Sequence, residues 1–276
     1  MKNGMQLKAV IKKAALDMGI APQAVLQTYM FERVLERIAH SSYSNKFIIK
    51  GGMLIAAIVG LDSRSTMDMD ATLKGISLNE NSVREALNEI FAIELDDNII
   101  FSITGIEAIR EDDVYGGFRA TFIASFDKLN VVLKMDLTTG DIITPREIDF
   151  SYPMLFKEGS LELLAYNLET ILAEKYETVI RRSTLNTRTR DFYDIYILVN
   201  SKLDQINGEI LKQAITLTTT KRESIDRISD SKRIITIIAE DEELKRRWKL
   251  YQKEFAYAVG IEWKDVMESV EWISSI

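Results

Sequence analysis

Two aspartates separated by one residue, Asp68 and Asp70, are the clearest chemical signal in this sequence. The residues around them predict a β-strand over 66–73, and residues two apart in a strand point to the same face. The two carboxylates would therefore lie side by side, with Met67 and Met69 on the opposite face. Like charges this close repel each other unless a cation neutralises them, and hard divalent cations prefer oxygen ligands. The pair therefore predicts a metal site.

A glycine pair precedes this strand and could supply a phosphate site. Gly51 and Gly52 come directly before a predicted short apolar helix over 53–59, and Arg64 and Thr66 lie between the glycines and the aspartates. Without side chains the glycine backbone can approach an anion, and a helix N-terminus favours negative charge. Either motif alone is more often a tight turn or a solvated strand edge. The two together, in this order, favour a triphosphate on the glycine turn with its magnesium on the aspartates.

A third carboxylate, Asp136, lies in a later predicted strand. Residues 130–137 alternate between apolar and polar side chains, which places Asp136 on the polar face with Val132 and Lys134. If this strand pairs near the first one, Asp136 completes a magnesium site. In the alternative interpretation Asp136 ends its strand and caps the turn over 138–141. Spacing alone leaves both open.

A lysine falls inside the apolar stripe of a predicted long helix over 161–180. At 100° per residue Lys175 lies on the same face as the leucines, isoleucines and valines of that stripe. An inward-pointing lysine is costly unless an anion meets it, which favours a phosphate ligand. The alternative is a lysine at the edge of the core whose ammonium group reaches solvent.

Two further aspartates, Asp191 and Asp194, begin the next predicted helix. They are three residues apart and share a face, within reach of Lys175 or of nearby arginines. Asp191 alone could also be a carboxylate at a helix start, where the helix dipole favours it. From Lys175 to Arg190 the sequence holds five basic residues and one acidic residue.

Composition restricts the class of protein. The chain has 276 residues, is 46% hydrophobic and carries a net charge of −7, so it can form two domains with their own cores, and any contact with nucleic acid must be local. The basic link, residues 181–190, is the candidate for that contact and is expected at the mouth of a cleft between domains.

Several classes of site are excluded. The absence of cysteine excludes a zinc ribbon and a cysteine nucleophile, and the single histidine, His40, ends a predicted helix and cannot supply a multi-histidine metal site. No apolar run reaches the roughly 18 residues of a membrane helix, and the N-terminus lacks the apolar core of a signal peptide. A cytoplasmic protein without membrane contact is therefore expected.

The element pattern predicts an α+β protein. Helices are expected over 5–18, 22–40 and 80–92. Strands are expected over 47–50, 66–73, 99–106, 118–126 and 130–137, with hairpin turns at 115–118 and 127–130. The sheet should therefore be mixed and mostly antiparallel. After Pro145 and Pro153 the pattern is almost entirely helical, which divides the chain into domains over 1–155 and 156–276.

Taken in order, these motifs resemble the AbiEii/AbiGii family of nucleotidyltransferase-like toxins. The shared motifs are Lys-Gly-Gly, Arg-x-Thr-x-Asp-x-Asp, Lys-x-Asp, and Arg-Asp-x-Tyr-Asp after the lysine helix, and they span residues 50 to 194. The family belongs to the DNA polymerase β-type nucleotidyltransferase superfamily and acts in type IV toxin–antitoxin and abortive-infection systems, a form of phage defence. The resemblance implies an N-terminal nucleotidyltransferase domain that holds metal and nucleotide, followed by a C-terminal helical domain.

The resemblance also implies residue roles. Residues expected to bind the nucleotide are Lys50, Gly51, Gly52, Arg64, Thr66 and Lys175. Residues expected to bind Mg²⁺ or Mn²⁺ are Asp68, Asp70 and Asp136. These three, together with Lys175, Asp191 and Asp194, are the expected catalytic residues.

The implied reaction transfers a nucleotide from an NTP to an RNA or protein acceptor, with tRNA 3′ ends as the substrate of characterised relatives. The expected partners are the NTP, tRNA, and an antitoxin encoded nearby that forms no stable complex. A second hypothesis is a toxin that binds an NTP such as GTP and acts by sequestration without transfer. Both need the same carboxylates, so the sequence does not separate them.

Overall fold

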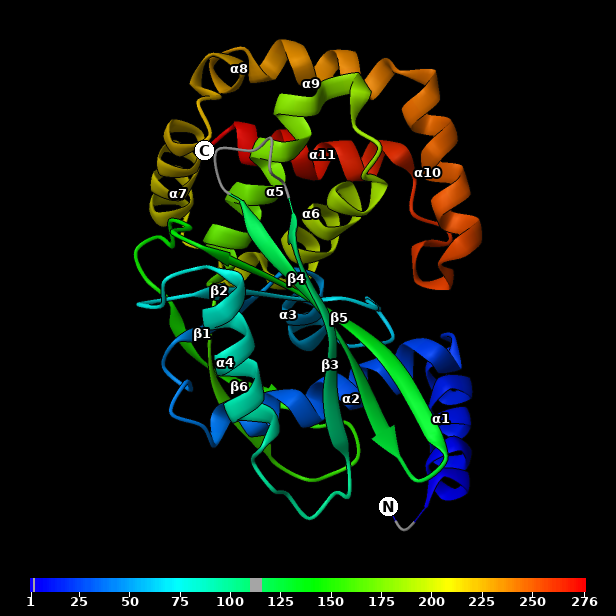
Figure 1. The fold of residues 1–276 in the computed structure, drawn as a ribbon. Coiled ribbons are helices and arrows are strands. Elements are labelled where there is room, and N and C mark those ends of the chain that lie inside the picture. Colours follow the sequence, from blue (N-terminus) through cyan, green and yellow to red (C-terminus); the bar gives the residue numbers. More distant parts are fainter. Residues whose placement is uncertain (2, 110–115) are drawn as a thin grey trace. The chain divides into compact units, whose positions relative to one another are not determined.

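The computed structural model describes residues 1, 3–109 and 116–276 (Figure 1). The chain divides into two compact units. Unit 1 contains residues 1–141 and 148–165, and unit 2 contains residues 142–147 and 166–276. The sequence pattern had placed the division at residue 155. The predicted hairpin turn at 115–118 lies partly outside the described residues.

Unit 1 is built from helices and one sheet. Its helices are α1 (Gly4–Met18), α2 (Pro22–Ala39), α3 (Gly51–Val59) and α4 (Glu80–Phe91). Its strands are β1 (Phe47–Lys50), β2 (Met69–Leu73), β3 (Ile100–Ile109), β4 (Gly117–Phe126), β5 (Leu129–Thr139), β6 (Ile148–Pro153) and β7 (Ser160–Ala165). As predicted, Pro22 takes the first position of α2, where its missing N–H costs nothing, and His40 caps the other end.

The seven strands form one sheet in the order β3-β4-β5-β2-β1-β7-β6. Strands β2 and β5 run parallel, as do β1 and β7, while the remaining neighbours are antiparallel. The prediction of a mixed, mostly antiparallel sheet is therefore confirmed. The hairpin between β4 and β5 also forms as predicted, with Phe126 opposite Leu129.

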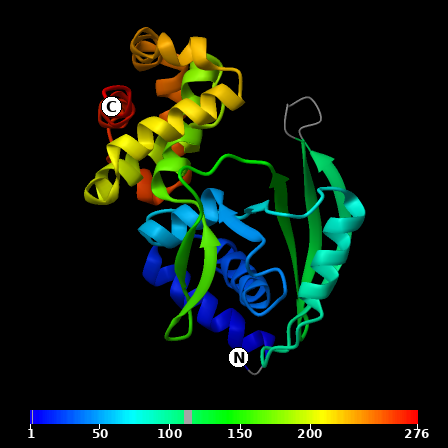
Figure 2. The same cartoon turned by 90° about the vertical axis from the view of Figure 1, so that its left-hand side faces the viewer.

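One face of the outer strands forms the core of unit 1. Phe122 on β4 lies 4.9 Å from Phe91 of α4 and 6.5 Å from Phe31 of α2, measured between ring centroids. Figure 2 shows α4 running along these strands. The opposite face is open, since Val132 on β5 is 54% exposed. Because side chains alternate along a strand, polar residues on β5 point to that open face.

The sequence pattern is wrong about residues 161–165, where it predicts the start of a long helix, and it does not predict strand β6. Leu161 and Leu164 were placed on a long helix, but both lie on β7, which pairs with β1 and β6. The helix, α5 (Leu168–Arg182), begins only after Asn167, whose side chain accepts a hydrogen bond from the Thr170 N–H. Leucine spacing across this short strand fits a helix as well as a strand, so pairing with β1 decided the outcome.

Unit 2 is helical. Besides α5 it contains α6 (Thr189–Lys202), α7 (Gly208–Lys221), α8 (Ile225–Ser229), α9 (Ser231–Glu240), α10 (Glu242–Glu254) and α11 (Trp263–Ser274). An aromatic group forms part of its core: Trp248 is 2% exposed and its ring lies 5.6 Å from that of Tyr251. The prediction of a helical C-terminal part is confirmed. Among the described residues, no helix is both long and apolar enough to cross a bilayer.

Candidate nucleotide and metal site

Gly51 occupies a position that only glycine fits. It begins α3 directly after β1, and its φ of +68° lies in the left-handed region that glycine adopts without strain. A Cβ atom at this position would lie 2.2 Å from Oδ2 of Asp70. The Asp70 carboxylate therefore lies directly against the glycine turn. The structure brings the predicted phosphate turn and a predicted metal ligand together.

Gly52 is enclosed by the loop that leads into β2. A Cβ atom here would lie 2.8 Å from Nη2 of Arg64 and 2.9 Å from Oγ1 of Thr66. Arg64 is buried and donates a hydrogen bond to the carbonyl of Ser65, while the Thr66 hydroxyl donates to the Asp68 carbonyl at 3.3 Å. Arg64 and Thr66 therefore line the start of α3, and Thr66 also holds the backbone of Asp68.

The two aspartates of the Asp-x-Asp motif occupy different environments. Strand β2 begins at Met69 rather than at Thr66, so Asp68 precedes the strand and is exposed, whereas Asp70 lies in it and is half-buried. The predicted alternation holds only from Met69 onward. Met67, outside the strand, is 50% exposed, whereas Met69 is fully buried.

The third carboxylate lies beside Asp70. Strands β2 and β5 are parallel neighbours, and Asp70 pairs in register with Asp136. Residues paired in this way on adjacent strands, about 4.8 Å apart, point to the same face. The predicted pairing of these strands is confirmed. Asp136 is 9% exposed and is not bonded to the turn over 138–141.

Arg119 on β4 is a site residue that the sequence reasoning missed. Its Nε and Nη2 donate hydrogen bonds of 2.7 and 2.8 Å to the two oxygens of Asp136. This bond raises the pKa of Arg119, and the charge of Asp68 contributes to the same effect. Only the register between β4 and β5, which places Arg119 opposite Asp136, could have shown the pair.

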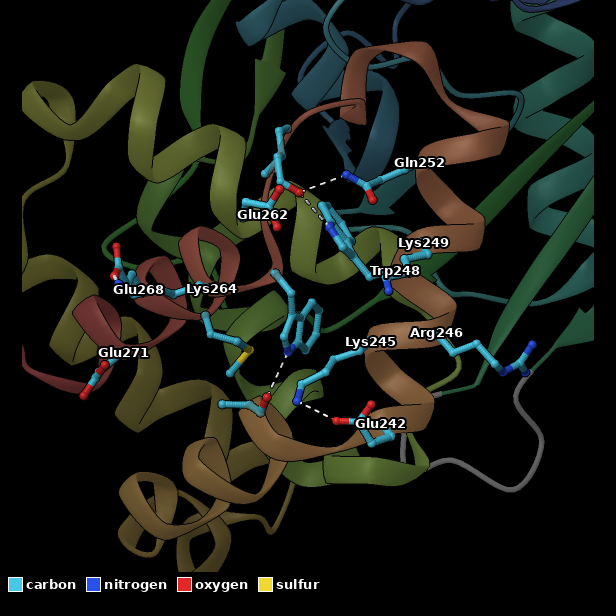
Figure 3. A pocket seen from close by; sticks show the side chains of 14 residues that line it. Glu242, Lys245, Arg246, Trp248, Lys249, Gln252, Glu262, Lys264, Glu268 and Glu271 are labelled. Carbon is cyan, nitrogen blue, oxygen red and sulfur yellow. Dashed lines mark hydrogen bonds and ion pairs between the residues drawn. The ribbon is translucent and has the colours of Figure 1, made fainter.

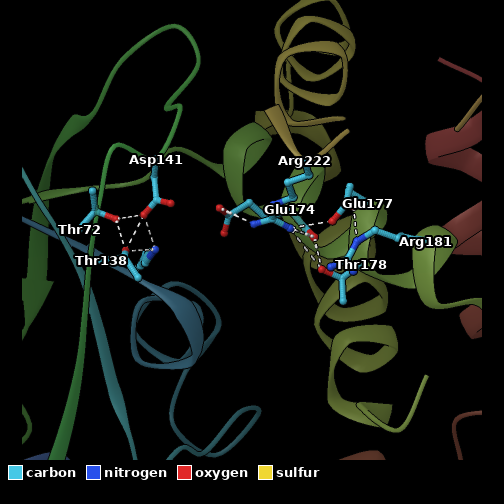
Figure 4. A network of polar contacts seen from close by, with 9 residues as sticks. Thr72, Thr138, Asp141, Glu174, Glu177, Thr178, Arg181 and Arg222 are labelled. Atoms are coloured by element: carbon cyan, nitrogen blue, oxygen red, sulfur yellow. Dashed lines mark hydrogen bonds and ion pairs between the residues drawn. The ribbon is translucent and has the colours of Figure 1, made fainter. Parts of the chain in front are cut away.

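A second polar cluster in unit 1 contains Thr72, Thr138 and Asp141 (Figure 4), and Lys50 bonds to it. The Lys50 Nζ donates hydrogen bonds to Oγ1 of Thr138 at 2.7 Å and to Oδ2 of Asp141 at 2.5 Å. Thr138, at 2.6 Å, and Thr72 donate to the same Asp141 oxygen. Burial alone would raise the pKa of Asp141, but the Lys50 charge and these hydrogen bonds hold it well below its usual range. Lys50, predicted to bind nucleotide, is here the counter-charge of a buried aspartate.

Replacing Lys50 with Met should destabilise unit 1. Asp141 would keep its two threonine donors but lose its counter-charge, so we expect the free energy of unfolding to fall by about 3 kcal/mol. Urea denaturation measures this loss. Lys128→Met, at an exposed hairpin position, is the matched control and should change stability by less than about 0.5 kcal/mol.

The same pair predicts an acid dependence. Because the pKa of Asp141 is lower in the folded protein than the unfolded value of about 3.9, its stabilising contribution is present above that pH and is lost as the pH falls further. Lys50→Met should therefore lose less stability than the parent between pH 5 and the acid limit. An unchanged acid dependence would contradict this assignment.

In unit 2, Lys175 points inward and meets two carboxylates. Its Nζ lies 2.6 Å from Oδ1 of Asp191 and 2.8 Å from Oδ2 of Asp194, whose side chains are 3% and 0% exposed. The expectation that these aspartates lie within reach of Lys175 is confirmed. Burial by itself would lower the pKa of Lys175, but the two carboxylates raise it, so the ammonium group stays charged. Whether Lys175 also binds phosphate stays a prediction.

Positive charge in the basic link is unevenly compensated. Arg181 pairs with the buried Glu177 at 2.7 Å, and Arg188 lies 3.2 Å from Asp191. Arg222, the residue that caps the C-terminal end of α7, reaches the same Glu177 at 2.7 Å (Figure 4). Burial, together with the like charges of Arg188 and Arg181, lowers the pKa of Arg182. Arg182 therefore lies close to the positive charges of Arg181 and Arg188.

A cavity of about 650 Å³ in unit 2 contains none of the predicted site residues (Figure 3). Its lining includes Trp263 and as many basic as acidic side chains. Lys245 pairs with Glu242 at 2.8 Å and Lys264 with Glu268 at 3.5 Å. Because these charges compensate each other, the cavity presents no surplus charge to a nucleotide or a metal ion.

The fold is shared with known nucleotidyltransferase-like structures. Two solved structures from Helicobacter pylori share the fold. A candidate nucleotidyltransferase is 14% identical over 93% of this chain and 96% of its own, with a TM-score of 0.50. The protein JHP933 is 14% identical over 92% of this chain and 93% of its own, with a TM-score of 0.51. The comparison with curated proteins found no match.

The sequence also matches a known family over most of its length. The profile described as nucleotidyl transferase AbiEii toxin, type IV toxin–antitoxin system, matches residues 33–273. The chain therefore belongs to the AbiEii family of nucleotidyl transferase toxins. The resemblance inferred from the motifs is confirmed, as is the α+β fold class.

Proposed function

We propose that this protein transfers a nucleotide from an NTP to an acceptor, using a divalent metal held by Asp68, Asp70 and Asp136. The observation that carries the proposal is the in-register pairing of Asp70 with Asp136, with the Asp70 carboxylate against the Gly51 turn. Family membership supports the reaction class. Exposure of Asp68 leaves this group of carboxylates open to solvent and therefore to substrate.

The carboxylates fit a hard cation. Among the described residues no three Asp, Glu, His or Cys side chains are already arranged around one metal position, but a cationic group, Arg119, is bound at Asp136 and feels the charge of Asp68. Three carboxylates supply the oxygen donors that Mg²⁺ or Mn²⁺ prefers. A bound ion would supply charge stabilisation for phosphoryl transfer and a lowered pKa for the attacking hydroxyl.

The chain's own residues would bind and orient the triphosphate. The start of α3 at Gly51 and Gly52 offers backbone N–H groups and the positive end of a helix dipole. Arg64 and Thr66 stand against this helix start and would add side-chain contacts to phosphate. Lys50, the residue directly before the Gly51 turn, bonds to Thr138 and Asp141 and so links this turn to the end of β5.

We also propose roles in the reaction for Lys175, Asp191 and Asp194, which lie together within unit 2. The two buried carboxylates hold the Lys175 ammonium group in one position and keep it charged, and we propose that it also donates to a phosphate of the nucleotide. We further propose an RNA acceptor, tRNA being the first candidate. The four arginines of residues 181–190 support contact with a phosphate backbone in a chain that is acidic as a whole.

Labelled nucleotides test the reaction directly. The protein is incubated with each α-³²P NTP, Mg²⁺ and total RNA, and we expect label in RNA of tRNA size with one preferred NTP. Asp149→Asn, which changes an exposed aspartate on β6 of the same sheet, is the control and should label RNA as the parent does. Tight retention of NTP with no labelled acceptor would instead support sequestration, and label in protein alone would exclude the RNA acceptor.

Replacing Arg182 with Gln should weaken the RNA contact specifically. Arg181 and Arg188 both pair with buried carboxylates, so changing them would also disturb the fold, whereas Arg182 can be changed alone. Loss of one phosphate contact should lower the slope of log affinity against log salt by about 0.7–0.9. Filter binding of tRNA over a salt series measures the slope. Arg227→Gln, at an exposed position on α8, is the control and should leave the slope unchanged. NTP binding should be unchanged in both variants.

A further inference from the structure

Arg119 is fixed to Asp136 by the architecture of the sheet. The two residues are register partners on the antiparallel strands β4 and β5, so their side chains leave the same face at the same level. Both oxygens of Asp136 accept hydrogen bonds from the guanidinium, at 2.7 and 2.8 Å. Bidentate arginine–carboxylate pairs are among the stronger side-chain contacts. The guanidinium therefore already occupies one acceptor position on each oxygen that a metal ion at Asp136 would use.

The same strand register offers Arg119 a second carboxylate. On its other side Arg119 is opposite Glu107 of β3, an exposed residue. Glu107 also adds to the negative potential at Arg119. Cross-strand neighbours on one face lie close enough for long side chains to pair. Arg119 therefore lies between Asp136, which belongs to the candidate metal site, and Glu107, which does not.

We propose that Arg119 is a positioning residue that competes with the metal for Asp136 and moves to Glu107 when the metal binds. This inference rests on the proposed function, because it takes Asp136 as a metal ligand. Arg119 keeps the buried Asp136 carboxylate neutralised until the metal arrives, which avoids an unpaired charge beside Asp70. Glu107 then receives the displaced guanidinium, so the exchange leaves no charge without a partner. Asp136 therefore binds the metal only when Arg119 moves away from it.

Binding of Mn²⁺ in the absence of nucleotide tests the exchange. Electron paramagnetic resonance counts free Mn²⁺, so affinity is measured without any reaction. Arg119→Gln removes the competitor and should bind Mn²⁺ roughly tenfold more tightly than the parent, as expected for loss of a charge-assisted contact. Glu107→Gln removes the acceptor of the guanidinium and should bind Mn²⁺ more weakly. In the Arg119→Gln background the Glu107 change should have no effect.

Lys134→Gln is the matched control for general electrostatics. Lys134 lies on the same strand as Asp136, is exposed, and carries the same charge as Arg119. Its removal should raise Mn²⁺ affinity far less than removal of Arg119. Equal gains in the two variants, or Mn²⁺ binding by Arg119→Gln that is no tighter than in the parent, would overturn the proposal. So would a Glu107 effect that persists without Arg119.

A separate variant keeps this test distinct from the test of the proposed function. If Asp70→Asn binds Mn²⁺ as the parent does, the metal site itself is wrong. If Asp70→Asn loses Mn²⁺ while Arg119→Gln gains nothing, the metal site stands and only the competition is wrong. Arg119→Lys keeps the charge but replaces the two-nitrogen contact with a single ammonium nitrogen, so its Mn²⁺ affinity should fall between those of the parent and Arg119→Gln.

Discussion

Asp70→Asn should lose nucleotide transfer almost completely while the protein remains folded. The substitution preserves the shape of a half-buried side chain and removes the charge that lies against the Gly51 turn. Without it, Asp68 and Asp136 would have to hold the metal alone, and metal stabilisation of phosphoryl transfer is worth several kcal/mol. We therefore expect a loss of about 10³-fold or more in the rate of RNA labelling. Asp68→Asn should behave in the same way.

Labelling rate, Mn²⁺ affinity and thermal unfolding together measure this effect. The rate and the affinity should fall while the unfolding temperature stays close to that of the parent. Full activity of folded Asp70→Asn and Asp68→Asn would refute the site assignment. Loss of stability equal to the loss of activity would show that Asp70 serves the fold.

Comparing alanine substitutions at Gly51 and Gly75 tests the same site geometry independently, without changing any carboxylate. Gly51→Ala would place a Cβ atom 2.2 Å from the Asp70 oxygen and so displace that carboxylate. Gly75 has almost the same backbone angle, φ +69°, but a Cβ there meets nothing within 4 Å. Gly75→Ala therefore matches the backbone strain without the collision. Metal binding should fall in Gly51→Ala and be retained in Gly75→Ala.

The parts of the site that local patterns encode were predictable. Alternation along residues 130–137 placed Asp136 on the polar face, and a glycine pair before a short apolar helix indicated the tight turn where Gly51 has a positive φ. Helical spacing likewise turned Lys175 inward, toward the face on which Asp191 and Asp194 lie. Each of these follows from a repeat of two or 3.6 residues, which is a property of the backbone itself.

What could not be predicted depends on strand register and on long-range pairing. Arg119 meets Asp136, and Lys50 meets Asp141, because particular strands are neighbours in the sheet. No local pattern states which strands pair or in what register. Strand β7 was missed for the same reason, since its pairing with β1 and β6 outweighs a leucine spacing that also fits a helix.

Because Lys175 pairs with both Asp191 and Asp194, its substitution should affect stability as well as nucleotide binding. From the sequence alone, Lys175→Met should keep the packing of its helix and weaken only nucleotide binding. In the structure the ammonium group neutralises two carboxylates that are 3% and 0% exposed. Removing it would leave two like charges buried side by side, with Arg188, 3.2 Å from Asp191, as partial compensation. Lys175→Met should therefore lower the free energy of unfolding by about 3–5 kcal/mol.

A double variant separates this structural role from the proposed catalytic one. Lys175→Met with Asp194→Asn removes one positive and one negative charge, so the charge beside Asp191 is again balanced by Arg188 and most of the stability should return. If Lys175 also neutralises the triphosphate, this restabilised variant should still bind NTP at least about tenfold more weakly than Asp194→Asn alone. Urea denaturation and NTP titration of the parent, both single variants and the double variant complete the cycle. NTP affinity that recovers together with stability would mean that Lys175 serves only to hold α5 and α6 together, because a lysine needed by the ligand cannot be replaced by removing its carboxylate partner.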